Sequence, residues 1–189
     1  MRGATMPQYR RWKIEGGMFF LTVVVHERRP LFGEAANRRL LREAITEAQA
    51  RRPFEITATV LLPDHLHALW QLPEGDAGFS CRMRGVKHGF TRAYLAAGGV
   101  EGASSPGQAR HRCRGVWQKR FHEHFIRDDT DLQRHLDYIL YNPVKHGYVD
   151  SPAKWRWSSF QRYVKLGLYP ADWCDPGRAS QFGMDPGFE

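Results

Sequence analysis

Apolar residues along the chain fall into segments whose spacing separates strands from helices. Alternation and a high content of aromatic and β-branched residues predict four strands, at residues 18–27, 54–62, 65–72 and 116–128. Apolar residues at helical spacing predict three helices, at residues 34–52, 79–97 and 130–142. We expect the third helix to begin at the capping residue Thr130 and to be stopped by Pro143 and Gly147.

The order of these elements predicts the fold class. A β-α-β-β-α-β-α order indicates an α+β fold with a central, mostly antiparallel sheet and helices packed on it. We expect a ferredoxin-like β-α-β-β-α-β core with a C-terminal extension. At 189 residues the chain has room for one domain with a proper core. That domain is expected at residues 1–171, with a mobile basic loop at 98–115 and a flexible tail at 172–189.

Composition narrows the class of protein further. With 42% hydrophobic and 25% charged residues the chain has the balance of a soluble globular protein. No apolar run approaches the roughly 20 residues that cross a bilayer, and the first residues lack the apolar centre of a signal peptide. We therefore expect a cytoplasmic protein without a membrane partner. Three widely spaced cysteines form neither a disulfide framework nor a paired zinc motif.

Charge points to a polyanionic partner. Lys and Arg number 28 against 20 Asp and Glu, which gives a formal net charge of +8 and a pI of about 9.7. The cations cluster in "YRRWK", "RMRGVKHGFTR" and "ARHRCRGVWQKR", where aromatic or bulky residues are interleaved with them. Such mixtures are typical of surfaces that hold both phosphates and bases, although solvated Lys and Arg faces are also common in soluble proteins.

Two histidines interrupt an otherwise apolar predicted strand. Successive strand side chains point to opposite faces, so His65 and His67 share one face and Leu66 points to the other. Two imidazoles at this spacing can reach one divalent ion from a rigid strand. A His-x-His pair also arises by chance as a structural or solvated feature. Asp64 is expected on the face of Leu66.

A second pair of polar residues lies on the predicted third helix. Tyr138 and Asn142 are four residues apart and therefore share a helical face. The amide oxygen of Asn142 is a hard ligand suited to Mg²⁺ or Mn²⁺, and the Tyr138 phenol lies one turn away. Taken singly, a core tyrosine and a helix-ending asparagine are the ordinary interpretations. Together with the histidines they predict phosphoryl transfer, in which a metal polarises a phosphate and a phenol attacks it.

These residues resemble the motifs of a known family. His65-Leu66-His67 resembles the His-hydrophobic-His motif of single-strand DNA nucleases and transposases that use one catalytic tyrosine. "YILYNPVKHGYV" resembles the tyrosine helix of the REP-associated tyrosine transposases, and "VWQKRFHEHFIRDD" and "WRWSSFQRYVKLGLYPADW" extend the likeness over residues 9–173. The resemblance implies His65, His67 and Asn142 as ligands of Mg²⁺ or Mn²⁺ and Tyr138 as the nucleophile. Better-known relatives have a glutamine in the place of Asn142.

The activity implied by the resemblance is ATP-independent cleavage and rejoining of single-stranded DNA through a 5′-phosphotyrosine, at imperfect palindromes that fold into hairpins. The active unit would be a monomer or a homodimer. The basic clusters supply a candidate set of DNA-binding residues: Arg10, Arg11, Arg82, Arg84, Lys87, Arg112, Arg114, Lys119, Arg120 and Lys145. Lys145 could also assist the phenol.

Two other functions are compatible with parts of this pattern. A non-catalytic nucleic-acid-binding module of similar fold would share the element order, although the glycine-containing aromatic signature of RNA-recognition domains is absent. A zinc hydrolase could combine the histidine pair with Asp64 or Glu123 and a metal-bound water. A second His-x-His pair, His122 and His124, flanks Glu123. Its imidazoles could approach the site or simply face solvent, and we expect them to face solvent.

Overall fold

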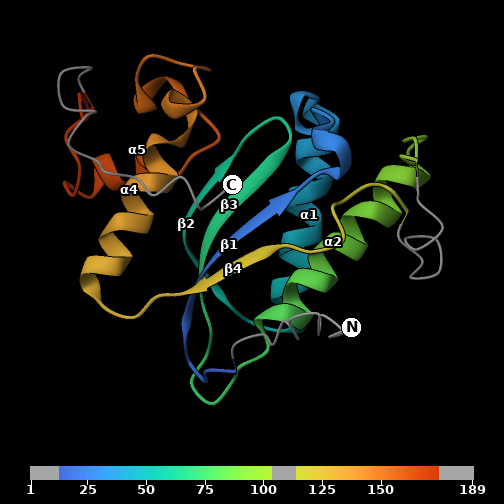
Figure 1. The fold of residues 1–189 in the computed structure, drawn as a ribbon, viewed down its shortest axis with the longest axis horizontal. Helices are drawn as coiled ribbons and strands as arrows, with labels where there is room; N and C mark the ends of the chain where they lie inside the picture. The colour runs from blue at the N-terminus through green and yellow to red at the C-terminus, as the bar shows by residue number, and fades with distance from the viewer. Residues whose placement is uncertain (1–12, 104–113, 175–189) are drawn as a thin grey trace, which may run out of the picture.

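The structure, a computed structural model, describes residues 13–103 and 114–174. Its centre is a four-stranded antiparallel sheet with the strand order β2-β3-β1-β4 (Figure 1). The strands are β1 (Met18–Val24), β2 (Glu55–Leu61), β3 (His65–Gln71) and β4 (His122–Phe125). With helices between β1 and β2 and between β3 and β4, this order is the ferredoxin-like arrangement, so the predicted fold class is confirmed.

Helices cover both faces of the sheet. The helices α1 (Ala35–Arg51) and α2 (Phe79–Ala96) pack on one face, whereas α4 (Asp129–Lys145) and α5 (Phe160–Lys165) lie on the other (Figure 1). Three short 3₁₀ helices complete the description: η1 (His26–Arg28), η2 (Leu31–Gly33) and η3 (Pro152–Lys154). None of the helices in the described ranges is long and apolar enough to span a membrane.

The alternation of β3 decides what each face receives. Leu66, Ala68 and Trp70 enter the core beneath α1 and α2. Leu69 enters the second core, which α4 and α5 cover. His65 and His67, four and two residues before it on the strand, point to the same face. Both faces of β3 are buried, because helices cover the sheet on both sides. The predicted histidine pair therefore lies beneath α4.

Three predicted boundaries differ from the structure. β1 ends at Val24, because Glu27 and Arg28 take the positive φ angles of 55° and 50° that turn the chain away. β4 is only four residues long, and Trp117 joins the sheet through a single bridge to Val25. The packed chain also extends past residue 171, since the ring of Trp173 lies 4.8 Å from that of Tyr169.

The third predicted helix does not stop at proline. Pro143 lies inside α4, which continues to Lys145. The proline lacks an N–H, so the helix loses one internal hydrogen bond there, but the following turn still closes because His146 N donates to Asn142 O over 3.1 Å. Gly147, with φ of 70°, ends the helix.

Several sequence predictions lie outside the described residues. They are the contacts of Arg10, Arg11 and Arg112, residues 104–113 of the predicted loop, and residues 175–189 of the predicted tail.

Arg82, a predicted DNA contact, is instead buried in the fold. Its side chain is 1% exposed, and its guanidinium donates to both carboxylate oxygens of Asp76, at 2.9 and 2.6 Å. It also donates to the carbonyl oxygens of Arg52 and Pro53. These bonds tie α2 to the segment that leads into β2. They occupy the guanidinium internally, so Arg82 has no place in the DNA-binding set.

We expect Asp76→Ala to lower the free energy of unfolding by about 2–4 kcal/mol, because the buried guanidinium loses its only ion-pair partner in the described chain. Hydrogen bonds from Arg82 lower the pKa of Asp76 from 3.8 to about 2. This carboxylate therefore stabilises the fold above pH 3.8, and its contribution is lost as pH falls through about 2. Urea unfolding at pH 7 and pH 2 measures both effects. Asp150→Ala, which removes an exposed ion pair with Lys154, is the control, and an equal loss in the control would contradict the prediction.

Candidate active site

The two histidines of β3 lie side by side on the sheet face beneath α4. His65 is 3% exposed and His67 is fully buried. Their ring centroids are 4.8 Å apart. The sequence prediction that they share a face is therefore confirmed, and both rings occupy a nearly dry environment.

Each imidazole is oriented through its Nδ1 atom. The carboxylate of Asp64 lies 2.6 Å from His65 Nδ1 and also accepts from Arg28 at 3.1 Å. The Thr22 hydroxyl lies 2.8 Å from His67 Nδ1. With both Nδ1 atoms engaged, Nε2 is the ring nitrogen left for a ligand. Asp64 does not point away from the pair as expected, because it lies in the turn before β3 and its carboxylate faces His65.

Electrostatics keep the inner imidazole neutral. Burial, reinforced by the positive potential of His65, His146, Lys145 and Arg28, lowers the pKa of His67 well below its usual value. A neutral imidazole is the form that binds a metal ion. Burial raises the pKa of Asp64, but its hydrogen bonds to His65 and Arg28 outweigh this and lower that pKa overall.

Tyr138 reaches this pair from α4. Its side chain is 2% exposed, and its ring lies 5.1 Å from that of His67. Two turns further along, at the C-cap of α4, the ring of His146 lies 5.3 Å from that of His65. Asn142 lies between these two contacts on the same helical face and is fully buried. The helix therefore runs alongside the histidine pair, with Asn142 one turn after Tyr138.

Unsatisfied polar atoms mark the centre of this site. Within the described chain, His67 Nε2 and both amide atoms of Asn142 are buried without a hydrogen-bond partner. Leaving such a group unpaired costs about 1–3 kcal/mol, so we expect a ligand to bind beside these atoms. An imidazole nitrogen and an amide oxygen are donors that a divalent cation accepts. The residues present therefore fit the predicted metal ion.

Two further residues, the last residue of α4 and its C-cap, lie close to the site. Lys145 Nζ lies 5.0 Å from the centroid of the Tyr138 ring. His146 was not predicted from the sequence, although its position four residues after Asn142 was an available signal. Burial and the neighbouring Cys174 thiol raise the pKa of the rival phenol, Tyr141.

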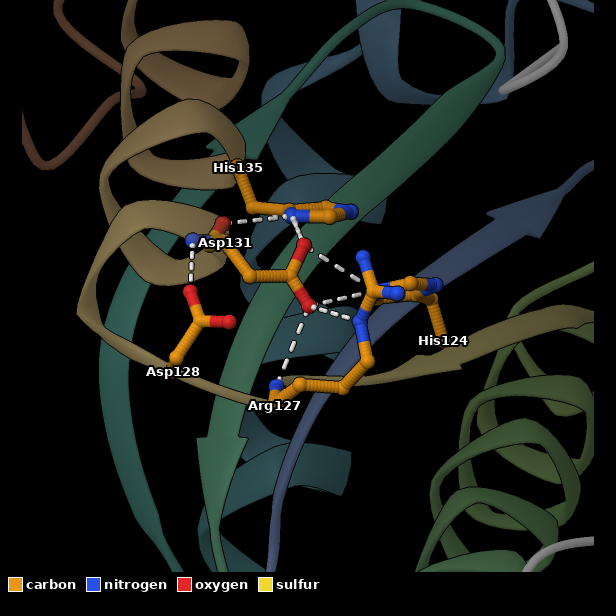
Figure 2. Close-up of polar contacts among 5 residues, drawn as sticks. All are labelled: His124, Arg127, Asp128, Asp131 and His135. Atoms are coloured by element: carbon orange, nitrogen blue, oxygen red, sulfur yellow. Dashed lines mark hydrogen bonds and ion pairs between the residues drawn. The ribbon is translucent and has the colours of Figure 1, made fainter.

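A second cluster of metal-binding residue types lies at the start of α4. His124 of β4 and Asp131 and His135 of α4 place one potential ligand atom each within 4.8 Å of one another, so the group could hold a metal ion. His124 therefore does not simply face solvent as expected. Figure 2 shows that these contacts converge on the Asp131 carboxylate.

The Asp131 carboxylate already has a full set of donors. It lies 2.9 Å from His124 Nε2 and 3.2 Å from His135 Nδ1, and it accepts from the backbone N and the Nε of Arg127 at 3.0 and 3.1 Å (Figure 2). Burial raises the pKa of Asp131, but the bonds from His124 and Arg127 hold it well below its usual value. The cluster thus fastens the first turn of α4 to β4.

A basic groove lies between α2 and residues 114–121. It has a volume of about 470 Å³, and four predicted DNA contacts line it: Arg84, Lys87, Arg114 and Lys119. Two hydrogen bonds connect its walls: Lys87 Nζ donates to the carbonyl oxygen of Gln118, and Trp117 Nε1 donates to the carbonyl oxygen of Lys87. Arg114 pairs with Glu101 at 2.6 Å, and Arg120 is exposed beside the groove.

The groove adjoins the histidine pair through the sheet. Gln118 N donates to Val24 O over 2.9 Å, and Val24 is the β1 partner of His65. The wall of the basic groove and the candidate metal ligands therefore flank the same end of β1.

Comparison with known proteins agrees with this geometry. The chain is 43% identical over 171 residues to the REP-associated tyrosine transposase of Escherichia coli (strain K12), covering 89% of this chain and 92% of the relative. It is also 43% identical over 169 residues to a putative REP-associated tyrosine transposase of Haemophilus influenzae, with coverage of 89% and 93%. The chain belongs to the REP-associated tyrosine transposases. No protein-family model matches it.

The fold of this transposase matches a solved member of the family. A structure of a REP-associated tyrosine transposase bound to a REP hairpin superposes with a TM-score of 0.75 at 42% identity, covering 90% of this chain and 92% of that one. The sequence resemblance is thereby confirmed, and the chain is an enzyme of the tyrosine transposase class.

We expect Asp131→Ala to lower the free energy of unfolding by about 2–4 kcal/mol, since it leaves the His124 imidazole and the Arg127 guanidinium without their shared acceptor, whereas His135 Nδ1 keeps its partner, the backbone oxygen of residue 131. Asp129→Ala is the matched control, because Asp129 is an exposed carboxylate in the same first turn. Chemical denaturation of both variants is the measurement. Equal stability of Asp131→Ala and wild type would show that the cluster does not anchor α4.

Proposed function

We propose that this transposase cleaves and rejoins single-stranded DNA at REP-like palindromic hairpins through a covalent 5′-phosphotyrosine on Tyr138. The observation that supports this most strongly is the approach of Tyr138 to His67, 5.1 Å between ring centroids, beside the unsatisfied Asn142 amide. The chemistry takes place on DNA, so we also propose a cytoplasmic location. The active unit is a monomer or a homodimer.

His65, His67 and Asn142 are the residues that would hold Mg²⁺ or Mn²⁺. When bound there, the ion would supply charge stabilisation to the scissile phosphate. Asp64 and Thr22 hold the two imidazoles by Nδ1, so Nε2 is the nitrogen that each ring would offer to the ion. A zinc hydrolase that uses Glu123 has no such support, because Glu123 pairs with Leu21 on the opposite face of the sheet.

Tyr138 supplies the nucleophile. Its phenolic oxygen forms a bond to phosphorus while the bond to the 3′ oxygen breaks, and the departing 3′ oxygen takes up a proton. Attack of a 3′-hydroxyl on the phosphotyrosine reverses these bonds and rejoins the strand, which is why no ATP is required. A free phenol ionises near pH 10, so the attack requires help in removing the proton, and Lys145, whose Nζ lies 5.0 Å from the centroid of the ring, is the proposed source of that help. Because Tyr138 is 2% exposed, the side chains that cover it must move to admit the phosphate.

The basic groove is the proposed binding site for the hairpin. Arg84, Lys87, Arg114, Lys119 and Arg120 supply positive charge to the phosphates, and Lys145 does so beside the nucleophile. Arg10, Arg11 and Arg112 keep the role predicted from the sequence. The rival function, binding without cleavage, would use the same groove but would leave the polar atoms beneath α4 without a purpose.

We expect Tyr138→Phe to abolish the covalent protein–DNA adduct, by about 1000-fold or more, and to leave hairpin affinity within about 2-fold, because only the attacking oxygen is removed. A single-stranded palindrome, Mg²⁺ and a denaturing gel report the adduct. Tyr141→Phe is the matched control on the same helix and should retain it. Wild-type adduct formation by Tyr138→Phe would exclude this nucleophile, and absence of any adduct from the wild type would favour the binding module.

We expect His67→Ala to weaken Mn²⁺ binding by more than about 100-fold, since loss of a direct ligand exceeds the 10–100-fold effect of an outer partner. Calorimetric titration with Mn²⁺ in the absence of DNA measures this. His88→Ala, which removes an exposed imidazole from the basic groove, should bind as the wild type does. Retained affinity in His67→Ala together with loss in His135→Ala would place the ion at the second cluster.

A further inference from the structure

A strained turn, η1, follows β1 at the end that the histidine pair and the basic groove flank. Glu27 and Arg28 take left-handed backbone angles there, with φ of 55° and 50°, although neither is a glycine. Residues with a Cβ rarely adopt this conformation, and it persists only where the surrounding structure fixes it. Strain of this kind gathers at functional sites, so the contacts of η1 indicate what the turn holds in place.

On one side, η1 is bonded to the turn that carries Asp64. Val25 N donates to Asp64 O over 2.8 Å, and Arg28 Nη1 donates to Asp64 Oδ2 over 3.1 Å. The other carboxylate oxygen of Asp64 lies 2.6 Å from His65 Nδ1. The exposed fraction of the side chain falls along this row, from 46% at Arg28 to 13% at Asp64 and 3% at His65. Arg28 therefore connects the surface to a buried candidate ligand.

On the other side, η1 is bonded to the chain that forms a wall of the basic groove. The guanidinium of Arg29 donates to the carbonyl oxygens of Val100 and Gly115, at 2.9 and 2.6 Å. His26 N donates over 3.0 Å to the carbonyl oxygen of Val116, a residue that lines the groove. The same short turn thus holds the groove wall and the partner of a candidate metal ligand.

Two glycines let the chain approach η1 closely at this wall. Gly102 N donates to Gly115 O over 3.0 Å, and Gly115 has a φ of 61°. A Cβ on Gly102 would lie 2.5 Å from Gly115 O and 2.7 Å from His26 Cδ2, both closer than real Cβ contacts. His26 Nε2 in turn donates to Ala103 O over 2.8 Å. The contact between η1 and this wall is therefore tight, and a side chain at Gly102 would break it.

We propose that η1 is a positioning element of the candidate metal site. Arg28 orients His65 through Asp64. Arg29 keeps the turn itself in place by fastening it to the wall of the groove. The inference rests on the proposed function, which assigns His65 to the metal ion. An imidazole whose carboxylate partner is itself held offers Nε2 in a fixed direction, so less freedom is lost when the ion binds. The ion pair of Arg28 is exposed and adds little to the stability of the fold, since backbone bonds already join the two segments.

The role of Arg28 is tested by calorimetric titration of the full chain with Mn²⁺ in the absence of DNA. We expect Arg28→Ala to weaken Mn²⁺ binding by about 10-fold, and Arg28→Lys, which can still donate to the carboxylate, to bind within about 3-fold of the wild type. In an Asp64→Ala background the link is already broken, so Arg28→Ala should change the affinity by less than about 2-fold. The thermal midpoint of metal-free Arg28→Ala should stay within about 3 °C of the wild type.

Wild-type Mn²⁺ affinity in Arg28→Ala would overturn the role of this residue. An equal effect of Arg28→Ala with and without the Asp64 carboxylate would overturn it as well, because the effect would then not pass through Asp64.

The role of Arg29 is tested in the same titration. Arg29→Ala removes two bonds that hold η1 but neither Asp64 nor His65, and we expect Mn²⁺ binding about 3-fold weaker, from the lost pre-organisation of the site. Arg29→Gln, which keeps a donor, should lie between Arg29→Ala and the wild type. Tyr94→Phe is the matched control, because the Tyr94 hydroxyl bonds to the N and O of Val100 from α2 and not from η1. Equal losses in Arg29→Ala and Tyr94→Phe, or no loss in Arg29→Ala, would overturn the role of the turn.

Failure of this inference is distinguishable from failure of the proposed function. If Arg28 acts on the metal site alone, excess Mn²⁺ should restore adduct formation by Arg28→Ala to within about 3-fold of the wild type, because mass action fills a weakened site. A loss of adduct that excess Mn²⁺ does not restore would overturn the inference by making Arg28 a DNA contact. Mn²⁺ binding that His67→Ala leaves unchanged rejects the proposed metal site itself. Binding that is lost in His67→Ala but unchanged in Arg28→Ala rejects the positioning role alone.

Discussion

The burial of β3 between two helical layers is the constraint on which the site depends. A strand covered on both faces has no position where a polar side chain can turn to water, so each imidazole on it needs a partner inside the protein. Asp64 and Thr22 meet that need at the Nδ1 atoms, which fixes both rings and leaves Nε2 as the remaining ring nitrogen. The same burial that makes the histidines costly fixes their orientation, which the proposed metal site requires.

The helix that carries Tyr138, the proposed nucleophile, is held differently along its length. Asp131 fastens its first turn to β4 through a contact with His124, and to the segment before the helix through a hydrogen bond from the backbone N of Arg127. Near its other end Pro143 removes one hydrogen bond from the ladder, and Gly147 terminates it. Tyr138 lies between the fastened and the weakened turn. The contacts of α4 therefore hold its first turn more firmly than its last, and under the proposed function the movement that admits DNA to the buried Tyr138 ring would start at the last turn.

Much of this architecture follows from patterns that are local in the sequence. Strand alternation is sufficient to place His65 and His67 on one face, and helical spacing is sufficient to align Tyr138 with Asn142. Features that depend on tertiary partners are not accessible in this way. Arg82 resembles the other cations of its helix, and only the folded chain shows that Asp76 and Pro53 enclose it. His124 gave no sign of its bond to Asp131, because the turn between β4 and α4 brings the two together.

The basic groove and the histidine pair lie at the same end of the sheet but on opposite faces. Gln118, Val24 and His65 follow one another across β1, so the wall of the groove and the pair flank the same end of that strand. The groove is lined by α2, whereas the pair lies beneath α4. Under the proposed function, DNA held in the groove would therefore have to pass around this end of the sheet to bring a phosphate to the histidines, so the proposed cleavage would take place beside the hairpin and not within it.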